Sequence, residues 1–246
     1  MKKVTKMTSL VIVMMITLMV LTGCANVNMK VKLNEDGSAD ISYVMGYNKE
    51  FLTSMNVKVE DLENEESFTE TMEAARDDGY TVTKYEDDSV FGFQAVKHVN
   101  HVKEFSVQDA TGEATEVEND SIQYEKSFLK TVYSQDSKMD LTNMNTYEED
   151  AQTSAMINMM MKQMKITYQI TLPFKVGDHN ATTVSEDGKT LTWEIKAGEI
   201  NEIKFIAMQD YTMFLMAGII ILVVIIVVAI ILIIMKKRKK VTPQEK

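Results

Sequence analysis

An uncharged apolar run near the C-terminus constrains this 246-residue chain more than any other feature. The run extends over 22 positions, from Phe214 to Met235, and contains no ionisable side chain. As a helix it covers about 33 Å, which is enough to cross the hydrocarbon core of a bilayer. In water a helix that is apolar on every side must be deeply buried, and the rest of the chain is too small to bury it. We therefore predict a transmembrane helix over residues 213–235.

A cluster of basic residues sets the direction in which this helix crosses the membrane. The sequence "KKRKK", residues 236–240, follows the apolar run directly. Basic residues that flank a membrane span remain on the cytoplasmic side. Residues 236–246 are therefore expected to form a basic cytoplasmic tail. Residues 24–212 then lie on the extracytoplasmic face of the cytoplasmic membrane.

The N-terminus has the features of a secretion signal that ends at a cysteine. Lys2, Lys3 and Lys6 precede an apolar core, Leu10–Leu21, that is too short to span a bilayer comfortably. The ending Leu21-Thr22-Gly23-Cys24 resembles the bacterial lipobox, in which the cysteine is diacylglycerated and becomes the first residue of the mature chain. We predict a signal peptide over residues 1–23, cleavage between Gly23 and Cys24, and lipidation of Cys24. The alternative is an ordinary signal peptide or a short anchor with an incidental cysteine.

Two anchors on one domain raise the question of what each contributes. A single acyl chain binds reversibly, whereas a spanning helix is effectively permanent. The helix alone is therefore expected to retain the protein, and the lipid to pin the N-terminus to the same outer leaflet. Because Cys24 is the single cysteine of the chain, it cannot form an intrachain disulfide, and no other thiol is available for catalysis or metal binding.

The segment between the two anchors is strongly acidic. Residues 25–213 contain 35 Asp and Glu against 17 Lys and Arg, a formal net charge of −18. This charge excludes nucleic acid as a partner and should repel a bare anionic bilayer. It would attract cations or basic partners. The simpler interpretation is that the charge keeps the domain soluble beside a crowded membrane.

Periodicity predicts an α+β domain with a mostly antiparallel sheet and two main packing helices. A hairpin is expected around the Asp36-Gly37 turn, because apolar residues alternate on both sides of it. Further strands are expected near residues 80–85, 90–96, 122–132, 166–172, 191–195 and 203–207, and a short helix near residues 103–106. The two main helices are expected after capping boxes formed by Ser67 and Glu70 and by Thr146 and Glu149. Gly79 is expected to end the first of them.

The second predicted helix contains the methionine-rich stretch "MINMMMKQM". Its apolar face would pack over the strand near residues 166–172 and could form an adaptable groove for a lipid. The residues of this candidate ligand face are Met156, Met159, Met160 and Met164. Two alternatives are that the methionines fill the core or that their thioethers bind Cu(I). The copper alternative is weak, because no cysteine is near and His179 is 15 positions beyond Met164.

Motifs that carry metal or enzyme chemistry are not recognisable in this sequence. His98 and His101 have an H-x-x-H spacing, but their surroundings are typical of a strand leading into a loop, which disfavours a zinc site. The stretch "NEDGSAD" lacks the ligand spacing of a calcium loop. The sequence contains no nucleophile elbow and no phosphate-binding loop. We therefore expect no metal, no cofactor and no enzymatic activity.

The order of these segments resembles the LppM-type bacterial lipoprotein domain. In that family an Asp-Gly turn lies in the first hairpin, as at Asp36-Gly37. A strand ending in "LP", a "DGKTLTW"-like turn and strand, and a last strand entering a membrane segment follow. The corresponding residues here are Leu172-Pro173, Asp187–Trp193 and Ile203–Ala207. The resemblance implies an α+β extracytoplasmic domain, suggests lipid binding, and transfers no catalytic residue.

We predict a membrane-anchored, non-enzymatic binding module of the cell envelope. Its expected ligand is a lipid or lipid-linked molecule, or else another envelope protein. The alternatives are an envelope hydrolase or transferase with an unrecognised site, and a structural subunit of a membrane complex. A lipid binder needs an apolar cleft, an enzyme needs converging polar groups with perturbed pKa values, and a complex subunit needs an exposed apolar patch.

Overall fold

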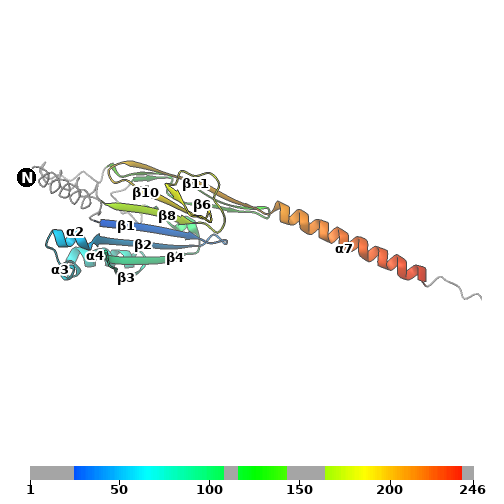
Figure 1. Cartoon of the computed structure of the whole chain (residues 1–246), viewed down its shortest axis with the longest axis horizontal. Coiled ribbons are helices and arrows are strands. Elements are labelled where there is room, and N and C mark those ends of the chain that lie inside the picture. The colour runs from blue at the N-terminus through cyan, green and yellow to red at the C-terminus, as the bar shows by residue number, and fades with distance from the viewer. Residues whose placement is uncertain (1–24, 108–115, 143–163, 240–246) are drawn as a thin grey trace, which may run out of the picture.

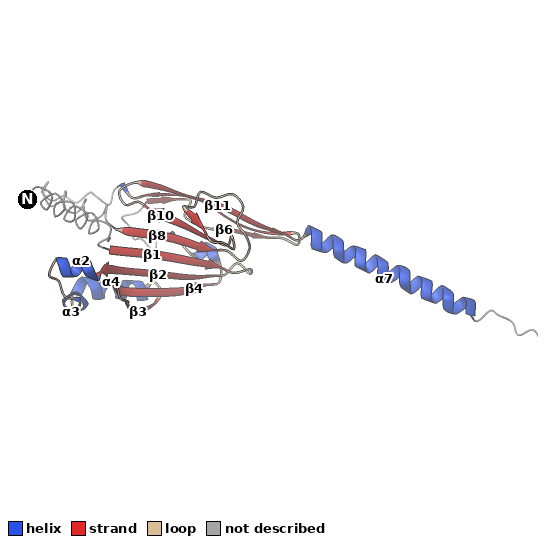
Figure 2. Cartoon of the chain, in the orientation of Figure 1, coloured by secondary structure: helices blue, strands red, loops and turns tan. Residues whose placement is uncertain are grey.

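The computed structural model describes residues 25–107, 116–142 and 164–239. Two β-sheets pack against each other to form the domain, and a long helix, α7, extends from one end of it (Figures 1 and 2). The α+β class and the mostly antiparallel pairing are as predicted. Of the two predicted main helices, the first is present, whereas the segment with Thr146, Glu149, Met156, Met159 and Met160 lies outside the described residues.

The larger sheet has seven strands in the order β3-β4-β2-β1-β8-β10-β9. Its strands are β1 Ala25–Leu33, β2 Ala39–Asn48, β3 Thr81–Glu86, β4 Val90–Val99, β8 Lys165–Thr171, β9 Thr183–Val184 and β10 Thr190–Ile195. Neighbouring strands pair antiparallel, except that β1 runs parallel to β8 with Val31 opposite Ile170. This parallel pair joins the first strand of the domain to a strand from its C-terminal part, at the centre of the sheet.

The smaller sheet has four strands, with β7 at its centre. Its strands are β5 Glu116–Glu118, β6 Gln123–Lys126, β7 Lys130–Asp140 and β11 Ile200–Asp210. The strand β11 pairs with β7 along its whole length and leads directly into α7, Thr212–Lys239. The strand region predicted near residues 122–132 contains β6 and the first residues of β7, and β11 was also predicted, whereas most of β7 and the three-residue β5 were missed.

The first hairpin forms around Asp36-Gly37, as the alternation of apolar residues predicted. Gly37 has a φ of 93°, a conformation that favours glycine, at the turn between β1 and β2. The Asp36 carboxylate accepts hydrogen bonds from the backbone N–H and the hydroxyl of Ser38 at 3.0 and 2.7 Å. These bonds hold the pKa of Asp36 below its usual value. The residues predicted to face inward along both strands are buried, apart from the half-buried Met45.

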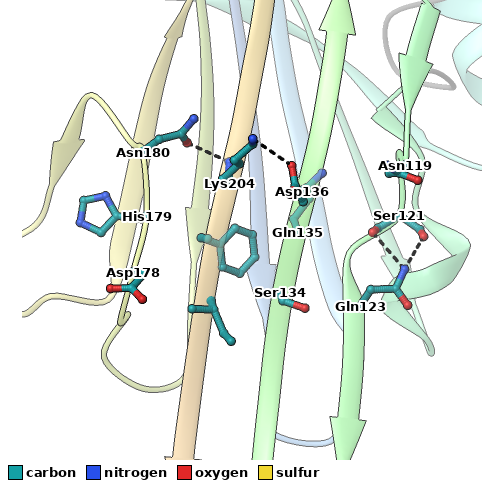
Figure 3. A pocket seen from close by; sticks show the side chains of 12 residues that line it. Asn119, Ser121, Gln123, Ser134, Gln135, Asp136, Asp178, His179, Asn180 and Lys204 are labelled. Carbon is teal, nitrogen blue, oxygen red and sulfur yellow. Dashed lines mark hydrogen bonds and ion pairs between the residues drawn. The ribbon is translucent and has the colours of Figure 1, made fainter.

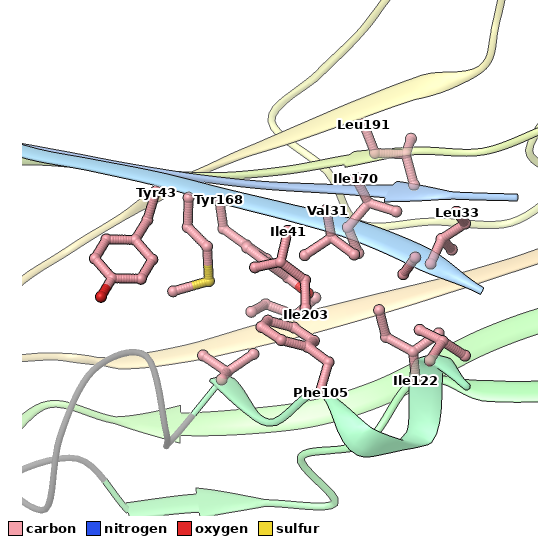
Figure 4. Close-up of a cluster of buried hydrophobic side chains, with 14 of the residues drawn as sticks. Val31, Leu33, Ile41, Tyr43, Phe105, Ile122, Tyr168, Ile170, Leu191 and Ile203 are labelled. Carbon is pink, nitrogen blue, oxygen red and sulfur yellow. The ribbon is translucent and has the colours of Figure 1, made fainter. Parts of the chain in front are cut away.

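The hydrophobic core lies between the two sheets, and its largest members come from strands that are distant in sequence (Figure 4). Val31, Ile41 and Ile170 from the larger sheet are at most 2% exposed, and Ile203 from β11 is fully buried. Burying a large aliphatic side chain stabilises a fold by about 1.5–3 kcal/mol. The core therefore explains why β1, β2, β8 and β10 direct alternate apolar residues inward.

Short helices close the end of the domain that is opposite to α7. They are α2 Lys49–Ser54, α3 Val59–Glu63 and α4 Glu66–Asp77. The apolar face predicted for the first main helix is confirmed, because Ala75 is buried and Phe68 and Met72 pack against the core. Gly79 follows α4 with a φ of 85°. The 3₁₀ turn Val102–Glu104 lies close to the predicted short helix.

The predicted capping box at Ser67 and Glu70 is wrong. The helix α4 begins two residues earlier, with Glu65 as its N-cap and without a side-chain hydrogen bond from that cap. The Phe68 ring stacks on Phe91 at 5.7 Å between ring centroids and lies edge-on to Phe93 at 6.0 Å. The packing of Phe68 against both rings holds the first turn of α4 against the sheet without a capping side chain.

Candidate binding groove

A groove lined by both polar and apolar side chains crosses the outer surface of the smaller sheet, and we call it the β7–β11 groove (Figure 3). Its volume is about 630 Å³, within the range of small-molecule sites. Four separate segments contribute side chains to it. They are Asn119, Ser121 and Gln123; Ser134, Gln135 and Asp136; Asp178, His179 and Asn180; and Lys204, Phe205 and Ile206.

The centre of the groove is an ion pair between neighbouring strands. Asp136 on β7 lies opposite Lys204 on β11 in the strand register. The Lys204 Nζ atom is 3.5 Å from an Asp136 carboxylate oxygen and 3.3 Å from a Glu202 carboxylate oxygen. Glu202, and then Asp136, raise the pKa of Lys204 above its ordinary value. Because all three side chains are exposed, the pairs add little stability, and they leave Lys204 firmly charged.

One wall of the groove is fastened to the free edge of β11. The backbone N–H of Gly177 donates to the Ile206 carbonyl at 2.9 Å, and the backbone N–H of Asn180 donates to the Lys204 carbonyl at 3.0 Å. The Asn180 side-chain oxygen accepts from the Trp193 indole N–H and from the Lys204 backbone N–H, both at 2.8 Å. This wall is therefore held rigidly, because Asn180 binds both β10 and β11.

The other wall is held by buried polar residues on the inner face of β7. Ser137 is 1% exposed, and its hydroxyl donates to the Asn119 carbonyl at 2.8 Å. The Gln135 amide is 3% exposed and donates to the Ser137 hydroxyl at 2.8 Å. At the rim, the Gln123 amide donates to the Ser121 hydroxyl at 2.7 Å. Buried polar groups need such partners, so this network fixes the position of residues 119–123.

Two buried tyrosines connect this sheet to the larger one. The Tyr168 hydroxyl donates to the Gln135 side-chain oxygen at 3.5 Å, beneath the groove. The Tyr133 hydroxyl donates to the backbone carbonyl of Asn34 in the first hairpin. Burial raises the pKa of both phenols well above their ordinary value.

These tyrosines predict how the domain responds to alkaline pH. An unfolded tyrosine has a pKa of about 10, so ionisation above that pH favours the unfolded chain. The stability contributed by Tyr133 and Tyr168 is fully present below about pH 10 and is lost as pH rises further. In an alkaline titration, we expect the exposed tyrosines to ionise first. The phenolate absorbance of Tyr133 and Tyr168 should appear only at higher pH, together with the loss of the far-UV circular dichroism. Complete ionisation of all nine tyrosines before the circular dichroism changes would contradict this prediction.

Most residues singled out from the sequence do not meet in this groove. Gly23, Cys24, Met156, Met159 and Met160 lie outside the described residues, and Met164 is half-buried just before β8. His98 lies on β4, where its Nδ1 atom is 2.7 Å from an Asp40 carboxylate oxygen, and His101 is exposed in the following loop. The part of the chain that the structure describes contains no group of three or more His, Cys, Asp and Glu suited to a metal ion.

The C-terminal helix has the properties predicted for it. Residues Thr212–Lys236 of α7 are long and apolar enough to cross a membrane and have no buried share. The Asp210 carboxylate accepts from the Thr212 backbone N–H at 2.7 Å, where the helix begins. Together, the length, composition and exposure of α7 indicate membrane association.

Comparison with known proteins supports the resemblance in the sequence. A family model described as the LppM domain matches residues 26–208. The NMR structure of the folded domain of LppM from Mycobacterium tuberculosis aligns with 77% of this chain and 92% of that domain, with 10% identity and a TM-score of 0.45. A search of curated proteins finds no match.

Proposed function

The chain belongs to the LppM domain family, and we propose that it is a non-enzymatic binding module of the bacterial cell envelope. In this proposal the β7–β11 groove holds the polar part of a membrane lipid or of a lipid-linked molecule. The observation that carries the proposal is the position of the groove. Its central residues lie on β11, the strand that leads directly into the candidate membrane helix.

The length of β11 limits how far the groove can lie from the membrane. Lys204 precedes the last residue of the strand, Asp210, by six positions. At about 3.3 Å per residue, the groove centre is within about 20 Å of Asp210 and within about 26 Å of Thr212, where α7 begins, in any orientation of the domain. A head group of a few polar units can extend over this distance while its acyl chains remain in the bilayer. The lipid can therefore bind in the groove without leaving the bilayer.

The side chains of the groove favour such a polar ligand over an acyl chain. Amide, hydroxyl, carboxylate, ammonium and imidazole groups line it beside one exposed apolar side chain, Ile206, whereas Phe205 is 4% exposed. Polar groups of a site that hydrogen-bond a ligand discriminate strongly against ligands that lack the matching group. This supports recognition of a head group by several hydrogen bonds.

The electrostatics of the groove also support binding rather than catalysis. A catalytic lysine needs a lowered pKa, so that the neutral amine can act as a nucleophile or a base. The pKa of Lys204 is shifted upward by Glu202 and Asp136 instead. Its role in the proposal is to donate hydrogen bonds from a charged ammonium group.

The proposal includes lipidation of Cys24 and a membrane span by α7, with residues 236–246 in the cytoplasm. β1 begins at Ala25, at the end of the domain opposite to α7 (Figure 1). Its nine residues cover about 30 Å. An acyl chain on Cys24 can enter the leaflet where α7 begins only if the domain lies along the membrane surface. If both anchors enter this leaflet, the domain lies along the membrane while α7 crosses it. The chain must then bend between Asp210 and α7.

Loss of the central ammonium should release the ligand. The full-length chain would be placed in nanodiscs made from the polar lipids of the producing bacterium and analysed by native mass spectrometry. We expect a retained lipid adduct on the unaltered protein and about tenfold weaker retention in Lys204→Ala, because a hydrogen bond to a charged group contributes about 1.5–3 kcal/mol.

Lys196→Ala is the matched control, because Lys196 also pairs with a glutamate but lies outside the groove. The control should retain the adduct at the level of the unaltered protein. Equal retention in Lys204→Ala and Lys196→Ala would argue against the groove as the binding site. A protein with no specific adduct would favour an envelope protein as the partner.

A further inference from the structure

The tip of the β6–β7 hairpin combines residues that are unusual for a turn. Ser127 and Lys130 close the turn, with the Ser127 backbone N–H donating to the Lys130 carbonyl at 2.8 Å. The two residues between them are Phe128, which is 81% exposed, and Leu129, which is 48% exposed. Turn positions favour Gly, Asn, Asp, Ser and Pro, each for a conformational reason that Phe and Leu do not share. Local turn geometry therefore does not explain these two side chains.

The structure joins this tip directly to the beginning of the membrane helix. The Tyr211 backbone N–H donates to the Leu129 carbonyl at 2.8 Å, and α7 begins at the next residue. Phe128 and Tyr211 border an apolar recess of about 440 Å³ on the side of α7. The helix lines it with Phe214, Leu215, Gly218, Ile219 and Leu222. A side chain at Gly218 would meet nothing within 4 Å, so the glycine leaves this face of the helix open.

The depth of the tip follows from the length of α7. The apolar part of the helix, residues 213–235, covers about 34 Å, slightly more than the hydrocarbon core of about 30 Å. Its first apolar turn therefore lies at the edge of the hydrocarbon, and Tyr211 lies in the interfacial zone where aromatic residues are enriched. Phe128 borders the same recess as Phe214 and Leu215, which places it at the same level.

The charge around the tip is opposite to that of the domain. Lys126 and Lys130 flank the two apolar residues, whereas residues 25–213 as a whole carry a formal net charge of −18. The Lys126 ammonium lies at the surface, 3.3 Å from the Glu35 carbonyl. Basic residues beside exposed apolar ones favour the anionic head-group region of a bilayer. The tip is thus an apolar point with two lysines at its base, of which Lys130 lies opposite Asp210 on β11.

We propose that the β6–β7 tip inserts Phe128 and Leu129 into the interfacial region of the leaflet that α7 enters, with Lys126 and Lys130 on anionic head groups. The inference rests on the membrane span assigned to α7 above. The tip and the helix then hold the domain at two adjacent points. Rotation about the bend between Asp210 and α7 is restricted, and the β7–β11 groove keeps one orientation toward the membrane.

The test measures the depth of a spin label at the tip. The full-length chain with Cys24→Ser and Ser127→Cys would carry one nitroxide beside an intact Phe128, in nanodiscs of phosphatidylglycerol and phosphatidylethanolamine. We expect the label to be more accessible to oxygen than to a water-soluble nickel chelate, as at an interface. A label at Asp88→Cys, on the exposed turn between β3 and β4, should show the reverse.

Two further variants separate insertion from a nonspecific effect of the label. Adding Phe128→Asp and Leu129→Asp should return the tip label to the accessibility of an aqueous site. Adding Ile200→Asp, which changes another exposed apolar residue of the same sheet, should leave the accessibility of the tip label at its interfacial value. Replacing the phosphatidylglycerol with phosphatidylcholine should make the tip label shallower, because the lysines lose their anionic partners.

The proposal is wrong if the tip label and the Asp88→Cys label have the same accessibility, or if the two aspartates leave the tip label unchanged. A third label at Val227→Cys, near the centre of α7, reports the span independently. A Val227→Cys label in the bilayer centre together with an aqueous tip label would overturn only the insertion of the tip. An aqueous Val227→Cys label would overturn the membrane span and this inference with it.

Discussion

A Gly92→Ala variant is expected to lose at least about 3 kcal/mol of the free energy of unfolding, at or above the upper end of the range for overpacking a close-packed interior. Gly92 on β4 lies opposite Gly46 on β2. A Cβ atom at Gly92 would lie 2.0 Å from the Met45 carbonyl oxygen and 2.5 Å from the Gly46 Cα atom. Both obstacles are backbone atoms, so no side-chain rotation can relieve the overlap. The two strands would have to separate where they pair.

Urea unfolding of the full-length chain in detergent micelles, followed by far-UV circular dichroism, measures this loss. Gly218→Ala is the control, because a Cβ atom there meets nothing within 4 Å. Gly218→Ala also replaces a glycine by an alanine, but in the helix α7, where alanine is more favourable than glycine. The control should unfold like the unaltered protein. A Gly92→Ala variant that also unfolded like the unaltered protein would contradict the close approach of β2 and β4.

A Trp193→Ala variant is expected to lose about 3–5 kcal/mol, the usual cost of removing a large buried aromatic side chain. Trp193 is 4% exposed, and its ring centroid lies 5.8 Å from that of Tyr168 and 6.3 Å from that of Phe205. Its indole N–H also donates to Asn180 in the wall of the groove. The substitution therefore leaves a cavity and removes one of the two donors to the Asn180 oxygen.

The same urea measurement separates these two effects. Trp193→Phe keeps most of the packing but loses the hydrogen bond, so it should cost about 0.5–1.5 kcal/mol from the bond itself and less in total than Trp193→Ala. Val184→Ala, on the exposed edge strand β9, should change stability by less than about 0.5 kcal/mol. A Trp193→Ala loss no larger than that of Val184→Ala would contradict the buried contacts of the indole.

The sequence predicted the elements whose signals are local. The first hairpin has alternation on both sides of Asp36-Gly37, and the structure forms it there, with Val31 opposite Ile41. The strand near residues 166–172 alternates in the same way and is present as β8. Gly79 ends α4 in the conformation that glycine permits. In each case a few neighbouring residues determine the backbone.

Features that depend on distant packing were not predictable in this way. The parallel pairing of β1 with β8 joins Val31 to Ile170, and period-2 alternation does not specify a strand's partner. The first turn of α4 is held by the contact of Phe68 with Phe91 and Phe93, and the local capping pattern pointed to another starting residue. Tertiary contacts override local preference at both places.

The β7–β11 groove escaped sequence analysis for a related reason. Its residues come from four segments, and none of them has a motif with fixed spacing. Asp136 and Lys204 are brought together only by the pairing of β7 with β11. A signal was nevertheless present at the tip beside α7, because "KSFLK" places two apolar residues between lysines. The sequence predicted one or two strands there, and the structure has the turn between β6 and β7 at these residues.

The measurement that tests the central claim most directly is photo-crosslinking at the groove in living cells. A photoreactive amino acid would replace Ser134 in the full-length chain, and in a second variant it would replace Thr83, which is exposed on β3. We predict that position 134 captures a lipid-linked molecule and that position 83 does not. Capture of a protein at position 134, or equal capture of lipid at both positions, would contradict a head-group site in the β7–β11 groove.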